Sequence, residues 1–209
     1  MTIKVIVFDF DGTLVDSNQL KHDAYFELFP DDNFYKEIVS DVLSDILEES
    51  RYVILKEILK RINLKIIDDN LDYRVQSLAN KYNDIVINGA KYCRERTGAK
   101  EILESLCKNF RLYLSSTTPE ASLKEIVKHR NWNGFFCDLF GFPNDKTSVL
   151  LNIIKKESVN PDELLVVGDG KSDRNSANSV KCKYFRISND SSLMALLDLN
   201  LKTTNLPFL

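Results

Sequence analysis

The stretch that decides the fold is residues 3–13, IKVIVFDFDGT. Residues 3–10 are rich in β-branched side chains and nearly continuously apolar, a pattern typical of a strand buried on both faces of a parallel sheet. Shorter apolar runs at 110–114 and 164–167 are also followed by small polar residues or glycine, and then by a helical pattern. Strand, loop and helix in repeated order predict an α/β fold with right-handed connections.

The segment between the first two predicted strands has a different character. From residue 13 to residue 88 it contains no glycine and a single proline, Pro30. Apolar residues recur at helical spacing in three stretches, 34–48, 51–62 and 70–92. Gly89 and Gly98 then indicate a return to loops. We therefore expect a sheet domain, residues 1–16 and 93–209, that is interrupted by a helical domain, residues 17–92.

The composition excludes several classes of protein. Of 209 residues, 44% are hydrophobic and 28% charged, as in ordinary globular chains. The net charge of −3 gives no basic excess for nucleic acid or an anionic membrane. The four cysteines lack C-x-x-C spacing, and no stretch suits a signal peptide or a membrane span. We expect a cytoplasmic protein, monomeric or homodimeric, that binds neither nucleic acid nor membranes.

Polar side chains gather where the predicted strands end. Ligands of open α/β sheets bind at the carboxyl ends of the strands, so these side chains are candidates for one site. They are Asp9, Asp11, Ser115, Ser116, Thr117, Thr118, Lys146, Asp169 and Asp173. Clustered carboxylates repel one another unless a cation lies among them, and an all-oxygen ligand set suits Mg²⁺. Lysine and hydroxyl donors opposite that cation would hold an anion, and phosphate is the anion most often bound this way.

The two aspartates after the first strand suggest a division of labour. Asp9 and Asp11 lie at i and i+2 and so point to the same side of the strand. Asp9 could attack phosphorus while Asp11 manages the proton of the leaving group. Plainer structural explanations stand beside this one. They are a strand-end turn for Asp9 and Asp11, helix capping for Asp169, Asp173 and the hydroxyls of residues 116–118, and a solvated side chain for Lys146.

Four segments resemble, in order, the motifs of haloacid dehalogenase-like hydrolases. They are DFDGT at 9–13, STTP at 116–119, GFPNDK at 141–146 and GDGKSD at 168–173. Their spacing resembles the subfamily with a helical cap between the first two motifs, and within it the phosphoglycolate-phosphatase-like members. The resemblance implies a Rossmann-like parallel sheet core with helices on both faces and an inserted α-helical cap.

The resemblance also implies catalytic roles. Asp9 would be the nucleophile that forms an aspartyl-phosphate, and Asp11 the general acid and then the general base. Lys146 would orient Asp9 and neutralise charge, while Ser116 and Thr117 would hold the phosphate oxygens.

The same resemblance implies a metal site and leaves one question of register. The expected Mg²⁺ ligands are Asp9, Asp11, Asp169 and Asp173. Ser115 replaces Ser116 as the phosphate ligand if the second motif is shifted by one residue.

The function that the resemblance implies is a magnesium-dependent phosphatase for a small phosphorylated metabolite, such as a sugar phosphate or phosphoglycolate. Arg51 follows Ser50 at a helix start, as in some phosphoglycolate-phosphatase-like members, and would hold a second anionic group of the substrate. An exposed arginine on a helix is the plainer explanation. Two other functions stay open: a phosphomutase of the same superfamily, and a non-catalytic regulatory domain that binds phosphate.

Overall fold

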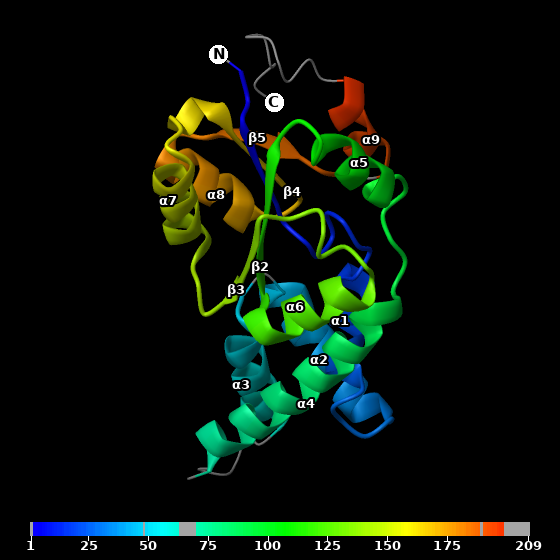
Figure 1. The fold of residues 1–209 in the computed structure, drawn as a ribbon. Coiled ribbons are helices and arrows are strands. Elements are labelled where there is room, and N and C mark those ends of the chain that lie inside the picture. Colours follow the sequence, from blue (N-terminus) through cyan, green and yellow to red (C-terminus); the bar gives the residue numbers. More distant parts are fainter. Residues whose placement is uncertain (1, 48, 63–69, 189, 199–209) are drawn as a thin grey trace. The chain divides into compact units, whose positions relative to one another are not determined.

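The structure, a computed structural model, describes residues 2–47, 49–62, 70–188 and 190–198. Within these residues, five parallel strands form one sheet in the order β3-β2-β1-β4-β5 (Figure 1). The strands are β1 (Val5–Phe8), β2 (Arg111–Pro119), β3 (Asp138–Phe142), β4 (Leu164–Gly168) and β5 (Lys183–Arg186).

The first strand occupies the centre of the sheet. Val7 pairs with Tyr113 of β2 on one side and with Val166 of β4 on the other, and every residue of β1 is buried. A central strand covered on both faces needs apolar side chains in both directions, which explains the continuous apolar run. The residues that follow β1 and β4 consequently emerge side by side at one edge of the sheet.

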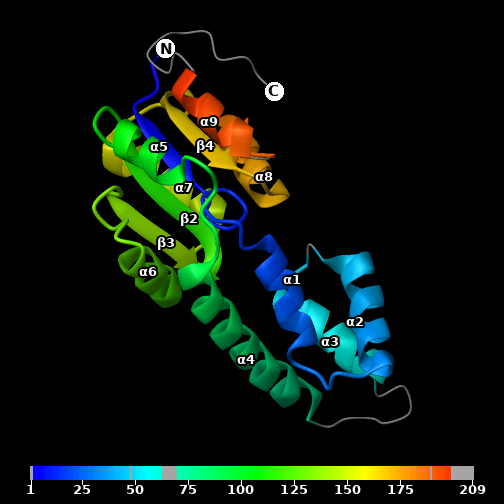
Figure 2. The same cartoon turned by 90° about the vertical axis from the view of Figure 1, so that its right-hand side faces the viewer.

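Helices cover both faces of this sheet. The helices on one face are α7 (Lys146–Glu157) and α8 (Lys171–Val180), and those on the other are α5 (Ala99–Leu106), α6 (Glu120–His129) and α9 (Asp190–Asp198) (Figures 1 and 2). On the first face, Val149, Ile153 and Ala177 share a buried cluster with Val5 and Val166. A short 3₁₀ helix, Pro161–Glu163, leads into β4. The predicted Rossmann-like α/β fold is confirmed.

The strands themselves depart from the sequence prediction. β1 is shorter than the predicted 3–10, and β2 continues five residues beyond 114 to Pro119. The extension contains buried serine and threonine, whose hydroxyls are bonded inside the protein, so an apolar pattern could not reveal it. β3 and β5 were not predicted, because their side chains are mostly half-buried and their sequences, DLFGF and KYFR, carry no continuous apolar run.

The chain divides into two compact units, which we name the sheet unit (residues 1–17 and 91–209) and the helical unit (residues 18–90). The helices of the inserted region are α1 (Asn18–Phe26), α2 (Asn33–Ile46), α3 (Arg51–Ile62) and α4 (Leu71–Tyr92). Val42, Ile54, Ile58 and Ala79 form part of the buried core of the helical unit. Residue 48, the predicted end of one helix, and residues 63–69 and 199–209 of the predicted domains lie outside the described residues.

Gly89 does not mark a loop, contrary to the sequence prediction. α4 continues through it to Tyr92. A Cβ atom at Gly89 would lie 2.5 Å from Cδ1 of Leu20, so the missing side chain allows α1 to approach α4. A glycine costs a helix interior about 0.5–1 kcal/mol relative to alanine, which the packing of a 22-residue helix can offset.

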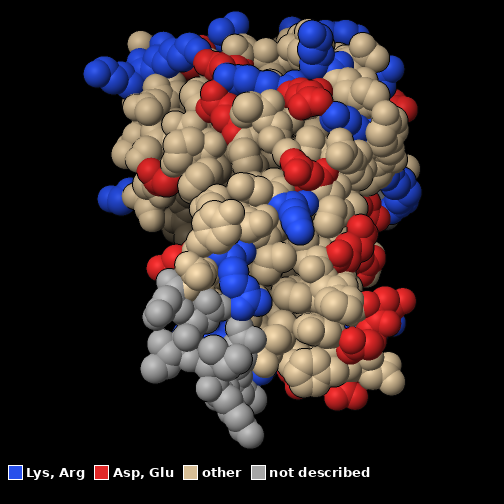
Figure 3. All heavy atoms as spheres, turned by 90° about the horizontal axis from the view of Figure 1, so that it is seen from below, with Lys and Arg blue, Asp and Glu red and all other residues tan. Residues whose placement is uncertain are grey.

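The surface carries both signs of charge. On the face shown in Figure 3, Lys and Arg side chains lie interspersed with Asp and Glu, in keeping with a net charge of −3. No helix in the described part of the chain is both long and apolar enough to cross a membrane.

Gly141 of β3 is a point where the fold leaves no room for a side chain. A Cβ there would lie 2.4 Å from Cα of Glu120 and 2.5 Å from the carbonyl oxygen of Thr118. These are backbone atoms, so the Gly141→Ala substitution has to move a strand or the start of α6. We expect it to lower the free energy of unfolding by about 1–3 kcal/mol.

Gly134→Ala is the matched control, because no atom lies within 4 Å of its Cβ position. We expect the control to change stability by less than about 0.5 kcal/mol. Urea denaturation of both variants measures the difference, and equal stability of the two would contradict the close approach at Gly141.

Candidate active site

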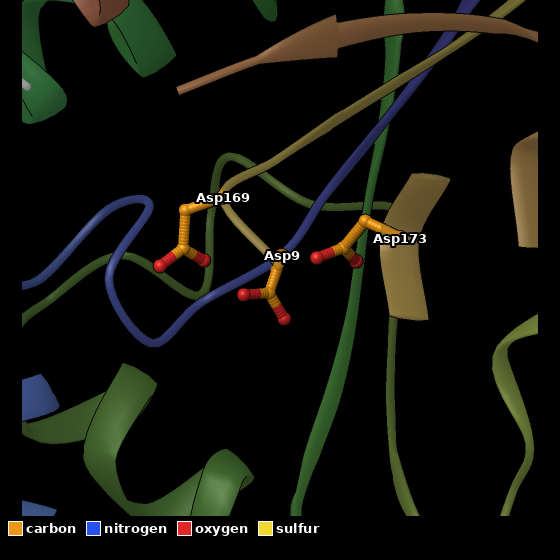
Figure 4. A group of neighbouring side chains, drawn as sticks. All are labelled: Asp9, Asp169 and Asp173. Atoms are coloured by element: carbon orange, nitrogen blue, oxygen red, sulfur yellow. The ribbon is translucent and has the colours of Figure 1, made fainter. Parts of the chain in front are cut away.

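Three carboxylates converge at the carboxyl edge of the sheet. Asp9 follows β1, Asp169 follows β4, and Asp173 lies in the first turn of α8 (Figure 4). One carboxylate oxygen from each lies within 4.8 Å of the others. Sheet pairing carries Asp9 to this point, since its backbone N–H donates to the carbonyl of Val167 at 2.8 Å. The topology thus brings together three of the four acidic residues that the sequence assigned to one site.

The backbone around Asp173 is shaped to fit its carboxylate. The backbone N–H of Gly170 donates to Oδ2 of Asp173 at 3.2 Å, so the helix-capping explanation is correct in part. A Cβ at Gly168 would lie 2.4 Å from Cγ of Asp173, which shows how closely the carboxylate lies against β4. The hydroxyl of Tyr184 supports this segment by donating to the carbonyl of Gly168 at 3.0 Å. Capping the helix and joining the carboxylate cluster are therefore compatible roles for Asp173.

Lys146 joins two members of the cluster. Its Nζ lies 2.7 Å from Oδ1 of Asp9 and 2.5 Å from Oδ1 of Asp173, and its side chain is only 11% exposed. Asp145 starts α7 at this position by accepting hydrogen bonds from the backbone N–H groups of Thr147 and Ser148. Lys146 is therefore a buried ion-pair partner and not a solvated side chain.

Burial changes the ionisation of these groups. Burial is the largest influence on Asp9 and, with repulsion from Asp173 and Asp11, outweighs the attraction of Lys146 and raises the pKa of Asp9 to about 8. Burial likewise raises the pKa of Asp173 in spite of Lys146. For Lys146, burial disfavours the charged form, but attraction to Asp9 and Asp173 prevails and raises its pKa above the ordinary value. The ammonium group therefore stays protonated beside two carboxyls that are costly to ionise.

Asp11 occupies a different environment from the other three aspartates. It is not a member of the carboxylate cluster. Ser17 donates to its Oδ1 at 2.6 Å, while Ser116 and Thr118 donate to its Oδ2 at 3.1 and 2.9 Å. All four side chains are buried. Of the four aspartates predicted as metal ligands, the structure brings together the carboxylates of Asp9, Asp169 and Asp173. Hydroxyl groups hold the carboxylate of the fourth, Asp11.

Sequence reasoning missed Ser17 and gave Thr118 no individual role. Ser17 follows Asp11 by six residues, and the loop of residues 10–15 folds back on itself, so the two side chains meet. The only signal available in the sequence was a serine at the start of the predicted helical region, and the same pattern is common in simple helix caps.

The second motif has the register that places Ser116 at the site. Ser116 and Thr118 are buried beside Asp11, whereas Thr117 between them is exposed. Ser116 also accepts a hydrogen bond from the backbone N–H of Thr118 at 3.0 Å. The N-cap of α6 is Pro119, which has no side-chain cap, and the hydroxyls of Ser116 and Thr118 donate to Asp11. Ser115 is buried in β2, but Ser116 is the serine bonded to Asp11.

Arg51 lies in the helical unit at the first turn of α3. Its guanidinium donates to Oδ1 of Asn83 and lies 5.6 Å from the centre of the Tyr82 ring. Tyr82 in turn packs on Tyr25, with ring centroids 4.5 Å apart. Arg51 is therefore held by neighbours on α4 and is not a freely solvated arginine.

The donor chemistry of the carboxylate cluster fits a hard divalent cation. Asp9, Asp169 and Asp173 offer only oxygen atoms, and Lys146 brings one positive charge to three carboxylates. The hydroxyl of Thr13 orients Asp169 by donating to its Oδ1 at 3.2 Å. Oxygen ligands of this kind suit Mg²⁺.

The raised pKa of Asp9 predicts a stability cost in the metal-free protein. A carboxyl group whose pKa is about 8 when folded and near 4 when unfolded destabilises the fold increasingly as the pH rises between these values. We expect Asp9→Asn, which removes the titration and keeps the shape, to raise the melting temperature at pH 8 with a chelator present. The gain should shrink at pH 5. A gain that is the same at both pH values, or no gain, would contradict the prediction.

Comparisons with known proteins agree with this geometry. Residues 6–187 match the family model described as haloacid dehalogenase-like hydrolase. A phosphoglycolate phosphatase from Vibrio parahaemolyticus is 26% identical over 195 residues, which span 89% of this chain and 84% of the relative.

Two solved structures share the fold. One, described as a predicted phosphoglycolate phosphatase from Haemophilus somnus, has a TM-score of 0.69 at 18% identity and covers 95% of this chain and 98% of its own. The other, the HAD-hydrolase YfnB from Bacillus subtilis bound to magnesium, has a TM-score of 0.68 at 16% identity and covers 95% and 100%. Because the family model matches residues 6–187, most of the sequence, this chain belongs to the haloacid dehalogenase-like hydrolase family.

Proposed function

We propose that the protein is a magnesium-dependent phosphatase that hydrolyses a small phosphorylated metabolite through an aspartyl-phosphate intermediate. The observation that carries the proposal is the buried contact of Lys146 with both Asp9 and Asp173, beside an Asp11 carboxylate held by three hydroxyls. The similarity to a phosphoglycolate phosphatase supports a small substrate of the sugar phosphate or phosphoglycolate kind.

The metal would be held by Asp9, Asp169 and Asp173. When bound, Mg²⁺ would neutralise charge on the phosphate and lower the pKa of Asp9. The carboxylate of Asp11 would not be a ligand of the metal, because its two oxygens accept hydrogen bonds from Ser17 and Thr118.

The reaction divides between two aspartates. An oxygen of Asp9 forms a bond to phosphorus while the bond from phosphorus to the ester oxygen breaks, and Asp11 gives its proton to the departing oxygen. Asp11 then takes a proton from water, whose oxygen attacks phosphorus and releases Asp9 and inorganic phosphate. Lys146 keeps Asp9 oriented and offsets negative charge, because it stays protonated between two carboxylates.

The hydroxyls of the second motif would bind phosphate. Ser116 is placed beside Asp11 and would hold a phosphate oxygen once substrate arrives. Thr117 is exposed on the neighbouring position of β2 and would offer its hydroxyl or backbone N–H to the same group.

The helical unit would act as a cap that selects the substrate. Arg51 is its best candidate for a second anionic group, since Asn83 and Tyr82 hold the guanidinium in place before substrate binds. Preorganisation of this kind lowers the entropy lost on binding. A substrate with a carboxylate or a second phosphate suits an arginine, which binds such groups through two parallel hydrogen bonds.

The first test is the release of inorganic phosphate from a panel of phosphorylated metabolites, with magnesium and with a chelator. The panel should include phosphoglycolate, sugar monophosphates and para-nitrophenyl phosphate. We expect release to require magnesium, and Asp9→Asn to lower it by at least about 10³-fold because the nucleophile is removed.

The control variant is Asp162→Asn, which removes a carboxylate from the sheet unit outside the site and should keep full activity. Near wild-type turnover by a folded Asp9→Asn protein would overturn the covalent mechanism. Conversion of a substrate without release of phosphate would identify a phosphomutase, and magnesium binding without any turnover would identify a regulatory domain.

The effect of removing Asp11 on kcat should depend on whether the leaving group needs a proton. We expect Asp11→Asn to slow hydrolysis of an alkyl phosphate by about 10²–10⁴-fold, the usual contribution of general acid–base catalysis. Para-nitrophenyl phosphate releases a stable anion that needs no proton, so Asp11→Asn should lower kcat for this ester much less. Measuring kcat for both esters tests the assignment, and equal losses would remove Asp11 from the role of acid.

A further inference from the structure

The loop that carries Asp11 is closed by its own hydrogen bonds. The backbone N–H of Gly12 donates to the carbonyl of Val15 at 2.8 Å, and that of Leu14 donates to the carbonyl of Phe10 at 2.9 Å. Gly12 has a φ of 76°, in the left-handed region. Glycine reaches many other backbone conformations at little cost, so contacts from outside the loop can add to these hydrogen bonds in holding this conformation.

A second segment of the sheet unit lies directly beside this loop. The backbone N–H of Arg96 donates to the carbonyl of Leu14 at 2.9 Å, and that of Asp16 donates to the carbonyl of Arg94 at 2.8 Å. Val15 and Glu95 form an antiparallel bridge. The chain thus leaves the sheet unit and returns to it along two paired segments.

The side chain of Arg96 reaches across this pairing to the loop. Its Nε donates to the carbonyl of Gly12 at 3.1 Å. Its Nη2 lies 3.9 Å from Oδ1 of Asp16, and the side chain is 15% exposed. Gly12 is itself buried, and a buried carbonyl needs a hydrogen-bond donor. Arg96 supplies one that carries a full charge and is therefore stronger than a neutral donor.

Arg94 offers a close comparison two residues away. It pairs with the same Asp16, at 3.1 Å, but its side chain is 60% exposed. The Arg94 guanidinium donates to Asp16, whereas Arg96 contacts both Asp16 and the Gly12 carbonyl.

We infer that Arg96 is a positioning residue for the reaction: through the Gly12 carbonyl it fixes the backbone that follows Asp11, and so the direction in which Asp11 presents its carboxyl group. The inference rests on the proposed function, in which Asp11 is the acid. A displaced Asp11 transfers its proton poorly, while Asp9 keeps its place after β1 through its backbone bond to Val167. Loss of Arg96 should therefore resemble a weak form of the loss of Asp11.

The test compares Arg96→Gln with Arg94→Gln in the full-length protein, using an alkyl phosphate and para-nitrophenyl phosphate. We expect Arg96→Gln to lower kcat for the alkyl ester about tenfold, as the loss of a charged hydrogen bond allows. Its kcat for the nitrophenyl ester and its KM for both should stay within about twofold, the range expected when only a transition-state interaction is lost. Arg94→Gln should leave both esters unchanged. Equal losses for the two esters in Arg96→Gln, or the same selective loss in Arg94→Gln, would overturn the inference.

Two further measurements separate this inference from the proposed function. The backbone amide NMR signals of Gly12 and Thr13 in the metal-free protein should shift in Arg96→Gln and stay in place in Arg94→Gln, and unmoved signals in both variants would overturn the contact whatever the activity. An Asp11→Asn protein that shows no dependence on the leaving group would instead refute the proposed role of Asp11, and the role of Arg96 with it. If Arg96→Gln does not fold, Arg96→Lys should show a smaller decrease in kcat that is again confined to the alkyl ester. If Arg96→Lys shows no such selective decrease, the inference is overturned.

Discussion

The contact of Lys146 with Asp9 and Asp173 is the interaction on which the site depends. Two carboxylates buried at one edge of a sheet repel each other and lose their hydration, and neither effect is small at low exposure. The ammonium lies within 2.7 Å of one oxygen from each. It can do so because α7 begins at Lys146 itself, after an Asp145 cap that fixes the first turn. Without this lysine, the carboxylates of Asp9, after β1, and Asp173, in α8, would lose the positive charge that pairs with both.

The four aspartates are divided between two environments, and the division suits two chemical roles. Asp9, Asp169 and Asp173 lie close together, and Lys146 contacts Asp9 and Asp173, a setting suited to a bound cation. Asp11 faces three hydroxyls, which can accept or donate as its proton comes and goes. Carboxyl groups that must do different work at one pH are usually separated by environment in this way.

The sequence predicted the parts of the site that topology alone brings together. Asp9 and Asp169 follow neighbouring parallel strands, so strand order places them side by side. Contacts that depend on loop conformation could not be predicted from the sequence. Ser17 and Arg96 meet the loop of residues 10–15 only because it folds back on itself, and no periodicity encodes that turn. The half-buried strands β3 and β5 were missed because their side chains follow neither an apolar run nor a strict alternation.

The raised pKa of Asp9 shows why such a site needs a well-packed scaffold. Holding a carboxyl group where it resists ionisation lowers the stability of the metal-free fold at neutral pH, since the unfolded chain ionises it freely. The central strand offsets this cost with four buried apolar residues paired on both sides. Placing Asp9 directly after that strand joins a carboxyl group that is costly to ionise to a central strand that is buried and paired on both sides. Asp9, the proposed nucleophile, then has little freedom to relax away from Lys146, and binding of a cation would relieve the charge repulsion without first having to order the backbone.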